Sequence, residues 1–108
     1  MFWVDLNPVK GSEQAGRRPV VVIQNDVGNE AAPTVIVAPL TTKSLTKHYP
    51  INVHAPRGVA GLKEDSTILL SQIRTIDKMR LDRKIGHLSP FHLKQVDQAI
   101  CISLGLSL

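Results

Sequence analysis

Short apolar runs separated by turn-forming residues recur along most of the chain. The runs are rich in β-branched residues, which favour buried strands, and proline, glycine, asparagine and aspartate stand between them. We therefore expect strands over 1–6, 19–24, 34–40, 50–55, 66–75 and 84–88, with one helical turn within 76–81. Strands at such close spacing predict a small, curled antiparallel sheet.

The end of the chain changes from this strand pattern to a helical one. Ser89 followed by Pro90 is a serine N-cap with proline in the first helical position, so a helix is expected from Pro90 to about Leu104. The stripe expected to face the core consists of Leu93, Val96, Ile100 and Leu104. The fold class predicted from the pattern is mainly β with a C-terminal α-helix.

Composition narrows the possible classes of protein. The chain has 108 residues, 43% of them hydrophobic and 20% charged, which fits a single globular domain over 1–108. No apolar run approaches the roughly 18 residues that would cross a bilayer, and no secretion signal is visible at the N-terminus. Cys101 is the only cysteine, which indicates a reducing cytoplasm. A net charge of +4 and a pI near 9.6 favour a polyanionic partner such as nucleic acid.

Most common catalytic motifs are missing from the sequence. The four histidines are scattered and only one cysteine is present, so no metal site is predicted. No phosphate-binding glycine motif and no serine-nucleophile motif occurs, so no cofactor is expected either.

The remaining candidate chemistry lies at the ends of two predicted strands. Arg17 and Arg18 precede Pro19, and strand pairing is expected to begin just past this proline because it has no N–H. Thr41 closes the strand over 34–40. If the two strands are antiparallel neighbours, Arg18 and Thr41 converge.

A guanidinium and a hydroxyl at one point suit the cleavage of RNA by its own 2′-OH. The pentacoordinate phosphorane is a dianion, and both groups donate hydrogen bonds to such a charge. The plainer interpretation is that the arginines keep a strand end solvated and that Thr41 satisfies local backbone groups. The residues alone leave both interpretations open.

Four stretches in order, at compatible spacing, resemble the MazF/PemK family of toxin endoribonucleases from bacterial type II toxin–antitoxin pairs. They read WVDLNP (3–8), GSEQ with RPVVVIQND (11–14 and 18–26), VAPLT (37–41) and LSQIRTID (70–77). The resemblance implies a small SH3-like antiparallel barrel (PemK/CcdB-like) with short helical turns and a C-terminal helix. It also implies sequence-selective, metal-independent cleavage of single-stranded mRNA, leaving 2′,3′-cyclic phosphate and 5′-OH ends and inhibiting translation. The partners that it implies are RNA and a cognate antitoxin; a homodimer is also implied, with no cofactor and no membrane.

The resemblance also assigns roles to individual residues. The catalytic arginine and threonine of the family fall on Arg18 and Thr41. Arginine is too weak an acid to be a comfortable base, so Arg18 is expected mainly to stabilise the phosphorane charge. The loop from Gly11 to Gly16 resembles a mobile flap over the substrate. The expected RNA contacts are Ser12, Glu13, Gln14, Arg17, Thr42, Lys43, Ser66 and Gln72.

Several alternatives stay open at this point. The same fold occurs in a toxin that binds DNA gyrase without cleaving RNA, and a third possibility is an RNA binder without catalysis. Trp3 either stacks on a base or packs in the core. A basic cluster either contacts RNA, contacts an acidic antitoxin segment, or is a solvated face. It consists of Arg74, Lys78, Arg80, Arg83 and Lys84.

Overall fold

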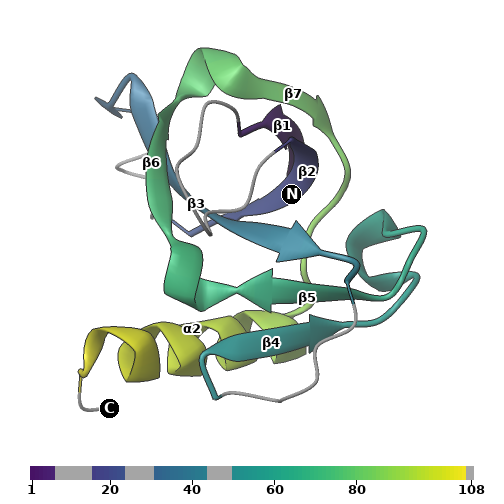
Figure 1. Cartoon of the computed structure of the whole chain (residues 1–108), viewed down its shortest axis with the longest axis vertical. Coiled ribbons are helices and arrows are strands. Elements are labelled where there is room, and N and C mark those ends of the chain that lie inside the picture. The colour runs from purple at the N-terminus through teal and green to yellow at the C-terminus, as the bar shows by residue number, and fades with distance from the viewer. Residues whose placement is uncertain (7–15, 24–30, 44–49, 107–108) are drawn as a thin grey trace.

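Antiparallel strands build most of the molecule (Figure 1). The computed structural model describes residues 1–6, 16–23, 31–43 and 50–106. The strands are β1 (Phe2–Asp5), β2 (Arg17–Val22), β3 (Thr34–Thr41), β4 (Asn52–Ala55), β5 (Ser66–Leu69), β6 (Arg74–Asp77) and β7 (Leu81–Lys84). The helical elements are the 3-10 helices Val59–Gly61, Leu70–Gln72 and Lys78–Arg80, and the α-helix α2 (Pro90–Leu104).

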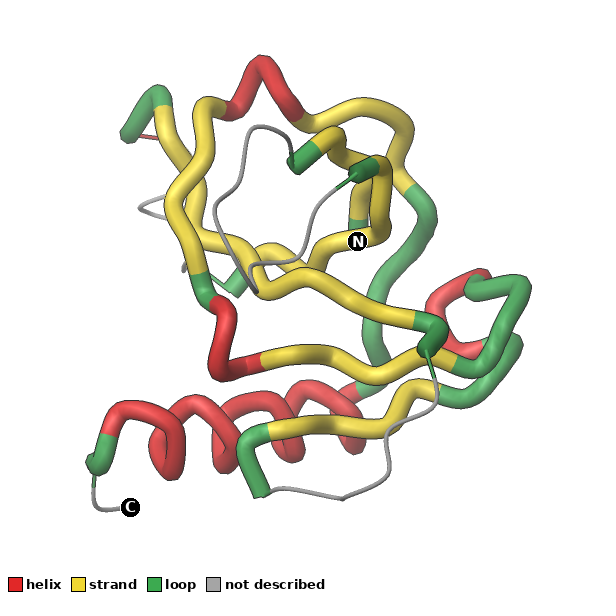
Figure 2. The backbone as a smooth tube through the Cα atoms, in the orientation of Figure 1, coloured by secondary structure: helices red, strands yellow, loops and turns green. Residues whose placement is uncertain are grey.

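The strands follow the order β4-β5-β3-β2-β1-β7, and β6 also pairs with β3. β3 is central because it pairs with β2, with β6 along its first half, and with β5 at its end. Figures 1 and 2 show β1, β2, β3, β6 and β7 curled into a barrel, while α2 lies against β4 and β5. This confirms the predicted barrel with a C-terminal helix.

Two apolar cores lie on the two faces of the curled sheet. Val20 belongs to the core inside the barrel, together with Val4 and Val37. Val21 belongs to the second core, which includes Leu40 and reaches Val96 on α2. Because successive residues of a strand point to opposite faces, β2 buries both sides. That explains why its sequence is a continuous apolar run rather than an alternating one.

Three predicted strand boundaries are wrong. β2 pairs with β1 from Arg17 onward, so Pro19 does not delay pairing, and Pro19 faces Trp3 within the ladder. An antiparallel ladder contains non-hydrogen-bonded pairs, and a residue without an N–H fits there. The segment 66–75 divides into β5 and β6 around a 3-10 turn, because β3 pairs with each half separately. The last strand is Leu81–Lys84 and not 84–88.

The bounds of α2 agree with the prediction, but only half of the expected stripe faces the core: Val96 is buried and Ile100 packs against the core, while the other two residues do not. Ser89 caps the helix by accepting the His92 N–H at 3.3 Å. Leu93 and Leu104 are 45% and 60% exposed, whereas Val96 and Ala99 are buried. The inward face is therefore rotated toward Ala99, because α2 packs on β4 and on the 3-10 turn after β5. Among the described residues, no helix is long and apolar enough to span a membrane.

Candidate active site

The antiparallel ladder between β2 and β3 brings the start of one strand to the end of the other. Val20 faces Pro39 and Val22 faces Val37 in this ladder. The two strands are therefore antiparallel neighbours, as the sequence argument required. The ladder ends at the pair of Val20 and Pro39, so Arg18 and Thr41 each lie two residues beyond its last pair.

Arg18 stands at the edge of the barrel core. It pairs with Val4 on β1 and shares its face of the sheet with Val4 and Val20, both of which are fully buried. Arg18 itself is half-buried. Charge interactions next to an apolar core are less screened than in water, so the positive charge of Arg18 acts beside a low-dielectric interior.

Thr41 is a buried hydroxyl at the end of β3, with 5% of its surface exposed. It faces Thr67 of β5, and its Oγ1 accepts a hydrogen bond from the Lys43 N–H at 3.2 Å. This hydrogen bond orients the hydroxyl and occupies one lone pair of its oxygen. The hydroxyl proton can still be donated to a further acceptor.

Arg17 has a different environment from its neighbour. Its Nη1 donates to Asp82 Oδ2 at 2.5 Å, with the two side chains 55% and 54% exposed. Its guanidinium carbon also lies 5.4 Å from the centre of the Trp3 ring, within reach of a cation–π contact. Consecutive strand residues point to opposite faces, so the two arginines separate into two environments. No local pattern pointed to Asp82, which is 65 residues away along the chain.

A cavity of about 120 Å³ lies beside the end of β3 and contains two of the predicted RNA contacts. Thr42 and Ser66 both line it, and Ser66 is buried, with its hydroxyl donating to the Glu64 carbonyl at 3.1 Å. The lining also includes Trp3 and Arg83, for which an RNA contact was one of the open alternatives, and Lys63 and Glu64, for which no role was predicted. Trp3 is half-buried, so it is neither fully packed in the core nor fully exposed.

The other predicted contacts are distributed around this region. Ser12, Glu13 and Gln14 lie outside the described residues. Lys43 is exposed just past the end of β3, and Gln72 is half-buried in the 3-10 turn between β5 and β6. In the described ranges, no three His, Cys, Asp or Glu side chains come together as a metal-binding group.

The stem of the β1–β2 loop is held by contacts that the sequence did not indicate. The Leu6 N–H donates to the Gly16 carbonyl at 2.9 Å and closes the stem. Arg74 Nη1 donates to the Leu6 carbonyl at 3.1 Å, and Arg80 donates to the Asp5 carbonyl. Both arginines thus bind the backbone at the base of the loop that was predicted to be the flap. The predicted basic cluster is therefore divided. Arg74 and Arg80 bind the stem of the loop, whereas Lys78 and Lys84 line a separate apolar groove.

Comparison with known proteins identifies the family. The family described as "PemK-like, MazF-like toxin of type II toxin-antitoxin system" matches residues 1–104. Endoribonuclease MazF from Staphylococcus saprophyticus is 51% identical over 106 residues, covering 98% of this chain and 88% of that protein.

Solved structures agree with this match. Toxin MazF-mt6 of Mycobacterium tuberculosis superposes with a TM-score of 0.83 at 24% identity, covering 99% of this chain and 97% of that one. A MazE–MazF crystal structure from Deinococcus radiodurans superposes with a TM-score of 0.73 at 25% identity, covering 98% and 92%. With a family match over nearly its whole length, this chain belongs to the PemK-like, MazF-like toxins of type II toxin–antitoxin systems.

Proposed function

We propose that this chain is a sequence-selective endoribonuclease toxin that cleaves single-stranded RNA, inhibits translation and is neutralised by a cognate antitoxin. Its likeness to an endoribonuclease MazF at 51% identity supports the activity. The single observation that supports the mechanism is the antiparallel β2–β3 ladder, whose last pair, Val20 and Pro39, lies two residues from both Arg18 and Thr41.

The proposed reaction needs no covalent enzyme intermediate. The ribose 2′-OH attacks the adjacent phosphorus and loses its proton, and a pentacoordinate phosphorane forms. The bond to the 5′-oxygen then breaks, and that oxygen takes up a proton, which leaves 2′,3′-cyclic phosphate and 5′-OH ends. Arg18 stabilises the dianionic phosphorane through its charge and its N–H donors, and the Thr41 hydroxyl donates one further hydrogen bond.

The substrate contacts belong to the same proposal. We assign contacts with the substrate to Thr42 and Ser66 in the cavity beside β3, and to Lys43, Gln72 and Arg17. Ser12, Glu13 and Gln14 complete the set from the loop whose stem Arg74 and Arg80 hold. We assign base selection to these residues, and place the reaction in the cytoplasm, where mRNA and a single free cysteine are both expected.

We further propose one toxin domain over residues 1–108 that forms a homodimer. On α2, Phe91 and Ile102 are 67% and 52% exposed, and they border a groove of about 380 Å³ against β4. Within the described residues, Asn52 Oδ1 in this groove is a buried acceptor without a hydrogen-bond partner. A second copy seated here would cover the apolar side chains and supply a donor.

The dimer is tested by light scattering at micromolar concentration, which is expected to give twice the mass of 11.8 kDa. A monomer would contradict the dimer.

A cleavage assay tests the function directly. Purified protein is incubated with single-stranded RNA in EDTA, and the product ends are identified by whether a 2′,3′-cyclic phosphate is present. We expect cleavage at short sequences, and its loss in Arg18→Ala and in Thr41→Ala while circular dichroism shows an intact fold. If both variants cut at the normal rate, the assignment of the site is wrong.

The same assay separates the alternatives. Intact RNA together with stalled gyrase complexes would support the gyrase-binding toxin. Salt-dependent RNA affinity without products would support an RNA binder without catalysis. Either result would overturn the proposed nuclease.

A further inference from the structure

The cavity beside the end of β3 has room for one small, flat group. Its volume of about 120 Å³ is well below the roughly 300 Å³ at which pockets for larger ligands begin. Trp3 and Pro19, which pair in the β1–β2 ladder, both line it, and so do Leu62 and Ile85. The lining therefore combines an indole ring with aliphatic side chains around a small space, which suits the flat face of a nucleobase.

Trp3 is held in place before any ligand enters the cavity. It lies opposite Pro19 in the ladder, and the guanidinium carbon of Arg17 lies 5.4 Å from the centre of its ring. Arg17 is in turn paired with Asp82. Because Trp3 is only half-buried, part of its surface remains accessible. A side chain oriented in this way loses little conformational freedom when it stacks on a base.

The segment 59–62 gives the cavity a rigid side. Gly61 and Leu62 line the cavity, and Leu62 is buried. The backbone is left-handed at Ala60, with φ of 50°, and at Gly61, with φ of 84°. A Cβ at Gly61 would lie 3.2 Å from the carbonyl oxygen of Ile85, so this segment packs closely on the connection after β7. A side fixed by backbone contacts keeps its shape, which a site that distinguishes similar bases requires.

The charged side chains around the cavity carry both signs. Lys63 and Arg83 are cations, Glu64 is an anion, and all three are exposed. None of them forms an ion pair with another residue of the described ranges. A nucleotide offers phosphates that attract cations and, in adenine and cytosine, an exocyclic amino group that donates to a carboxylate. The mixed charges therefore complement a nucleotide better than an apolar or a purely anionic ligand.

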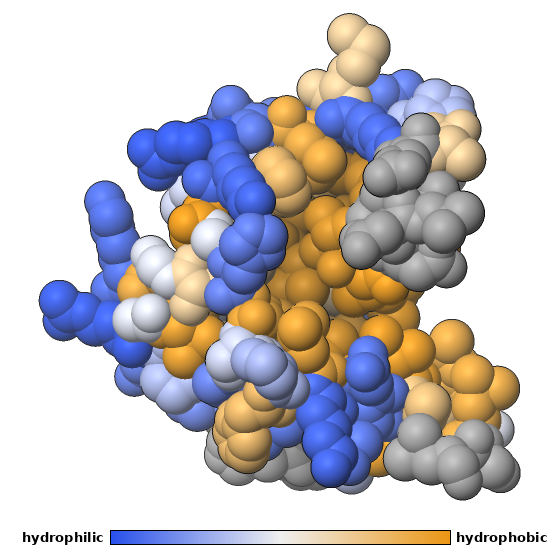
Figure 3. All heavy atoms as spheres, turned by 180° about the vertical axis from the view of Figure 1, so that it is seen from behind, coloured by the Kyte–Doolittle hydropathy of each residue, from blue (hydrophilic) through white to orange (hydrophobic). Residues whose placement is uncertain are grey.

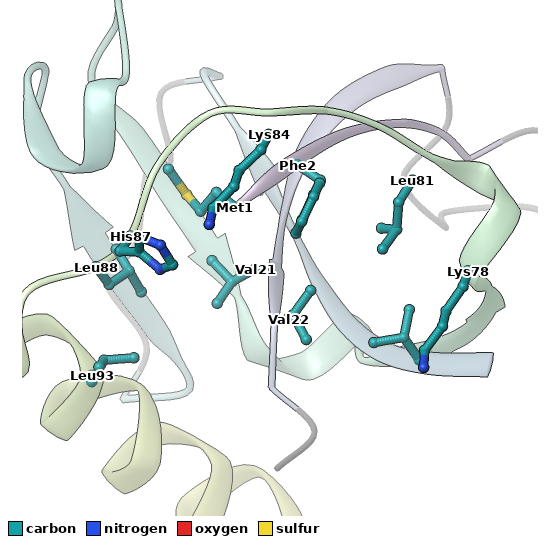
Figure 4. Close-up of a pocket in the computed structure, with 11 residues that line it drawn as sticks. Met1, Phe2, Val21, Val22, Lys78, Leu81, Lys84, His87, Leu88 and Leu93 are labelled. Carbon is teal, nitrogen blue, oxygen red and sulfur yellow. The ribbon is translucent and has the colours of Figure 1, made fainter. Parts of the chain in front are cut away.

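A larger apolar groove elsewhere on the molecule differs in both size and charge. Figure 3 shows it on the face away from the view in Figure 1, as a hydrophobic hollow with hydrophilic residues around it. It has a volume of about 420 Å³ and lies where the start of β1, the end of β2, β7 and the start of α2 meet (Figure 4). Its rim is basic, because Lys78, Lys84 and His87 line it and the lining contains no aspartate or glutamate. Of the two hollows, only the cavity beside β3 combines the size of one base with a carboxylate.

The cavity adjoins the proposed catalytic pair along the chain. Pro19 follows Arg18 in β2, Thr42 follows Thr41 at the end of β3, and both Pro19 and Thr42 line the cavity. Because consecutive residues of a strand point to opposite faces, the cavity and Arg18 lie on opposite sides of the start of β2. A nucleotide with its phosphate at Arg18 reaches the cavity only if its base leaves the stack, which single-stranded RNA permits.

We propose that the cavity beside β3 takes one unstacked base of the RNA next to the cleaved linkage, and selects a base with an exocyclic amino group over uracil. The face of the base stacks on Trp3, its amino group donates to the Glu64 carboxylate, and Arg83 binds a neighbouring phosphate. The proposal rests on the proposed function, because it takes its ligand from the cleavage of RNA. It adds these three residues to those that determine the cleaved sequence.

Trp3 is the only tryptophan of the chain, so its fluorescence reports directly on the cavity. The full chain is titrated with single-stranded DNA of mixed sequence, which lacks the attacking 2′-OH and stays intact. We expect saturable quenching with the parent chain, and about tenfold weaker binding in Glu64→Ala and in Arg83→Ala. The matched controls, Asp97→Ala and Arg57→Ala, remove exposed charges outside the cavity and should bind within about twofold of the parent chain.

Mapping of the cleavage sites tests the selection of the base. The same proteins are incubated with a pool of single-stranded RNA of randomised sequence, and the cut positions are sequenced. We expect the parent chain to prefer an amino-bearing base over uracil at one position beside the cut, and Glu64→Ala to reduce this preference about tenfold. Asp97→Ala should keep the preference of the parent chain.

Three outcomes would overturn the base site. They are an unchanged base preference in Glu64→Ala, equal DNA affinity in the cavity variants and the controls, and Trp3 fluorescence that DNA does not quench. Cytidine monophosphate is titrated as well, and tighter binding of this free nucleotide than of DNA would overturn the assignment to the RNA substrate. Saturable quenching that depends on Glu64, in a chain that does not cut RNA, would overturn the proposed nuclease and leave the base site intact.

Discussion

The two ends of β2 carry surfaces of opposite character. At its start are two arginines, of which Arg17 is exposed and Arg18 is half-buried. At its end, Val21 and Val22 line the apolar groove under α2. Between these ends the strand is buried on both faces.

The two ends of the strand suit different kinds of ligand. A dianionic phosphorane needs oriented donors and positive charge, which a strand end can provide without burying an unpaired ion. A protein segment is held mostly through apolar area, which the strand supplies where its valines reach the edge of the core. The comparison predicts that substitutions at one end leave the function of the other unchanged.

The largest effect is expected at Arg18, in contrast to its neighbour Arg17. Arg18→Ala should lower kcat about 100- to 1,000-fold, the usual loss for one donor to a developing anion. Arg17→Ala should leave kcat nearly unchanged and raise KM only a few-fold, since Arg17 is engaged with Asp82 and Trp3. Steady-state cleavage of a fluorogenic RNA measures both constants. A larger kcat loss in Arg17→Ala than in Arg18→Ala would reverse the assignment.

The next effect concerns the hydroxyl of Thr41. Thr41→Val keeps the shape of a buried side chain but removes the hydrogen-bond donor, and it leaves the Lys43 N–H without its acceptor. We expect a loss in kcat of about 100-fold. Thr41→Ser keeps the hydroxyl and should retain most activity, and Thr42→Val serves as the neighbouring control. Equal rates in Thr41→Val and Thr41→Ser would contradict a role for the hydroxyl.

A smaller effect is expected on stability at the connection between β7 and α2. A Cβ on Gly86 would lie 2.4 Å from the Ala60 carbonyl oxygen, a backbone atom that cannot move aside easily. Gly86→Ala should therefore destabilise the fold by about 1–3 kcal/mol, as overpacking does. Urea unfolding measures this, with the exposed Gln98→Ala as control. A midpoint unchanged from the parent chain would show that the turn over 59–61 is not held at this distance.

The smallest effect belongs to the ion pair between Arg17 and Asp82. Both side chains are more than half exposed, so solvent screens the pair and its contribution should be about 0.2–1 kcal/mol. A double-mutant cycle of Arg17→Ala and Asp82→Asn isolates this coupling, which should fall as salt rises. A coupling that is independent of salt would indicate that the contact of Arg17 with Trp3 dominates instead.

The local patterns predicted most elements and the two candidate catalytic residues. Ser89 and Pro90 marked the start of α2, and the strands that carry Arg18 and Thr41 are antiparallel neighbours, which was the condition of the argument for this pair. Pro19 was misleading, because the ladder with β1 accepts it opposite Trp3. The assignment of Arg18 over Arg17 came from family resemblance and remains a prediction for the cleavage assays.

The amino-acid sequence by itself determined the secondary structure types and the family, since both depend on short segments whose neighbours lie close along the chain. Only the tertiary structure decided which face of α2 is buried, that Arg17 meets Asp82, that Arg74 holds the Leu6 carbonyl and that the groove has a basic rim. Each of these depends on residues tens of positions apart, brought together by the pairing of strands and the packing of the helix. No local preference of the backbone encodes such contacts, because they exist only once the sheet has curled.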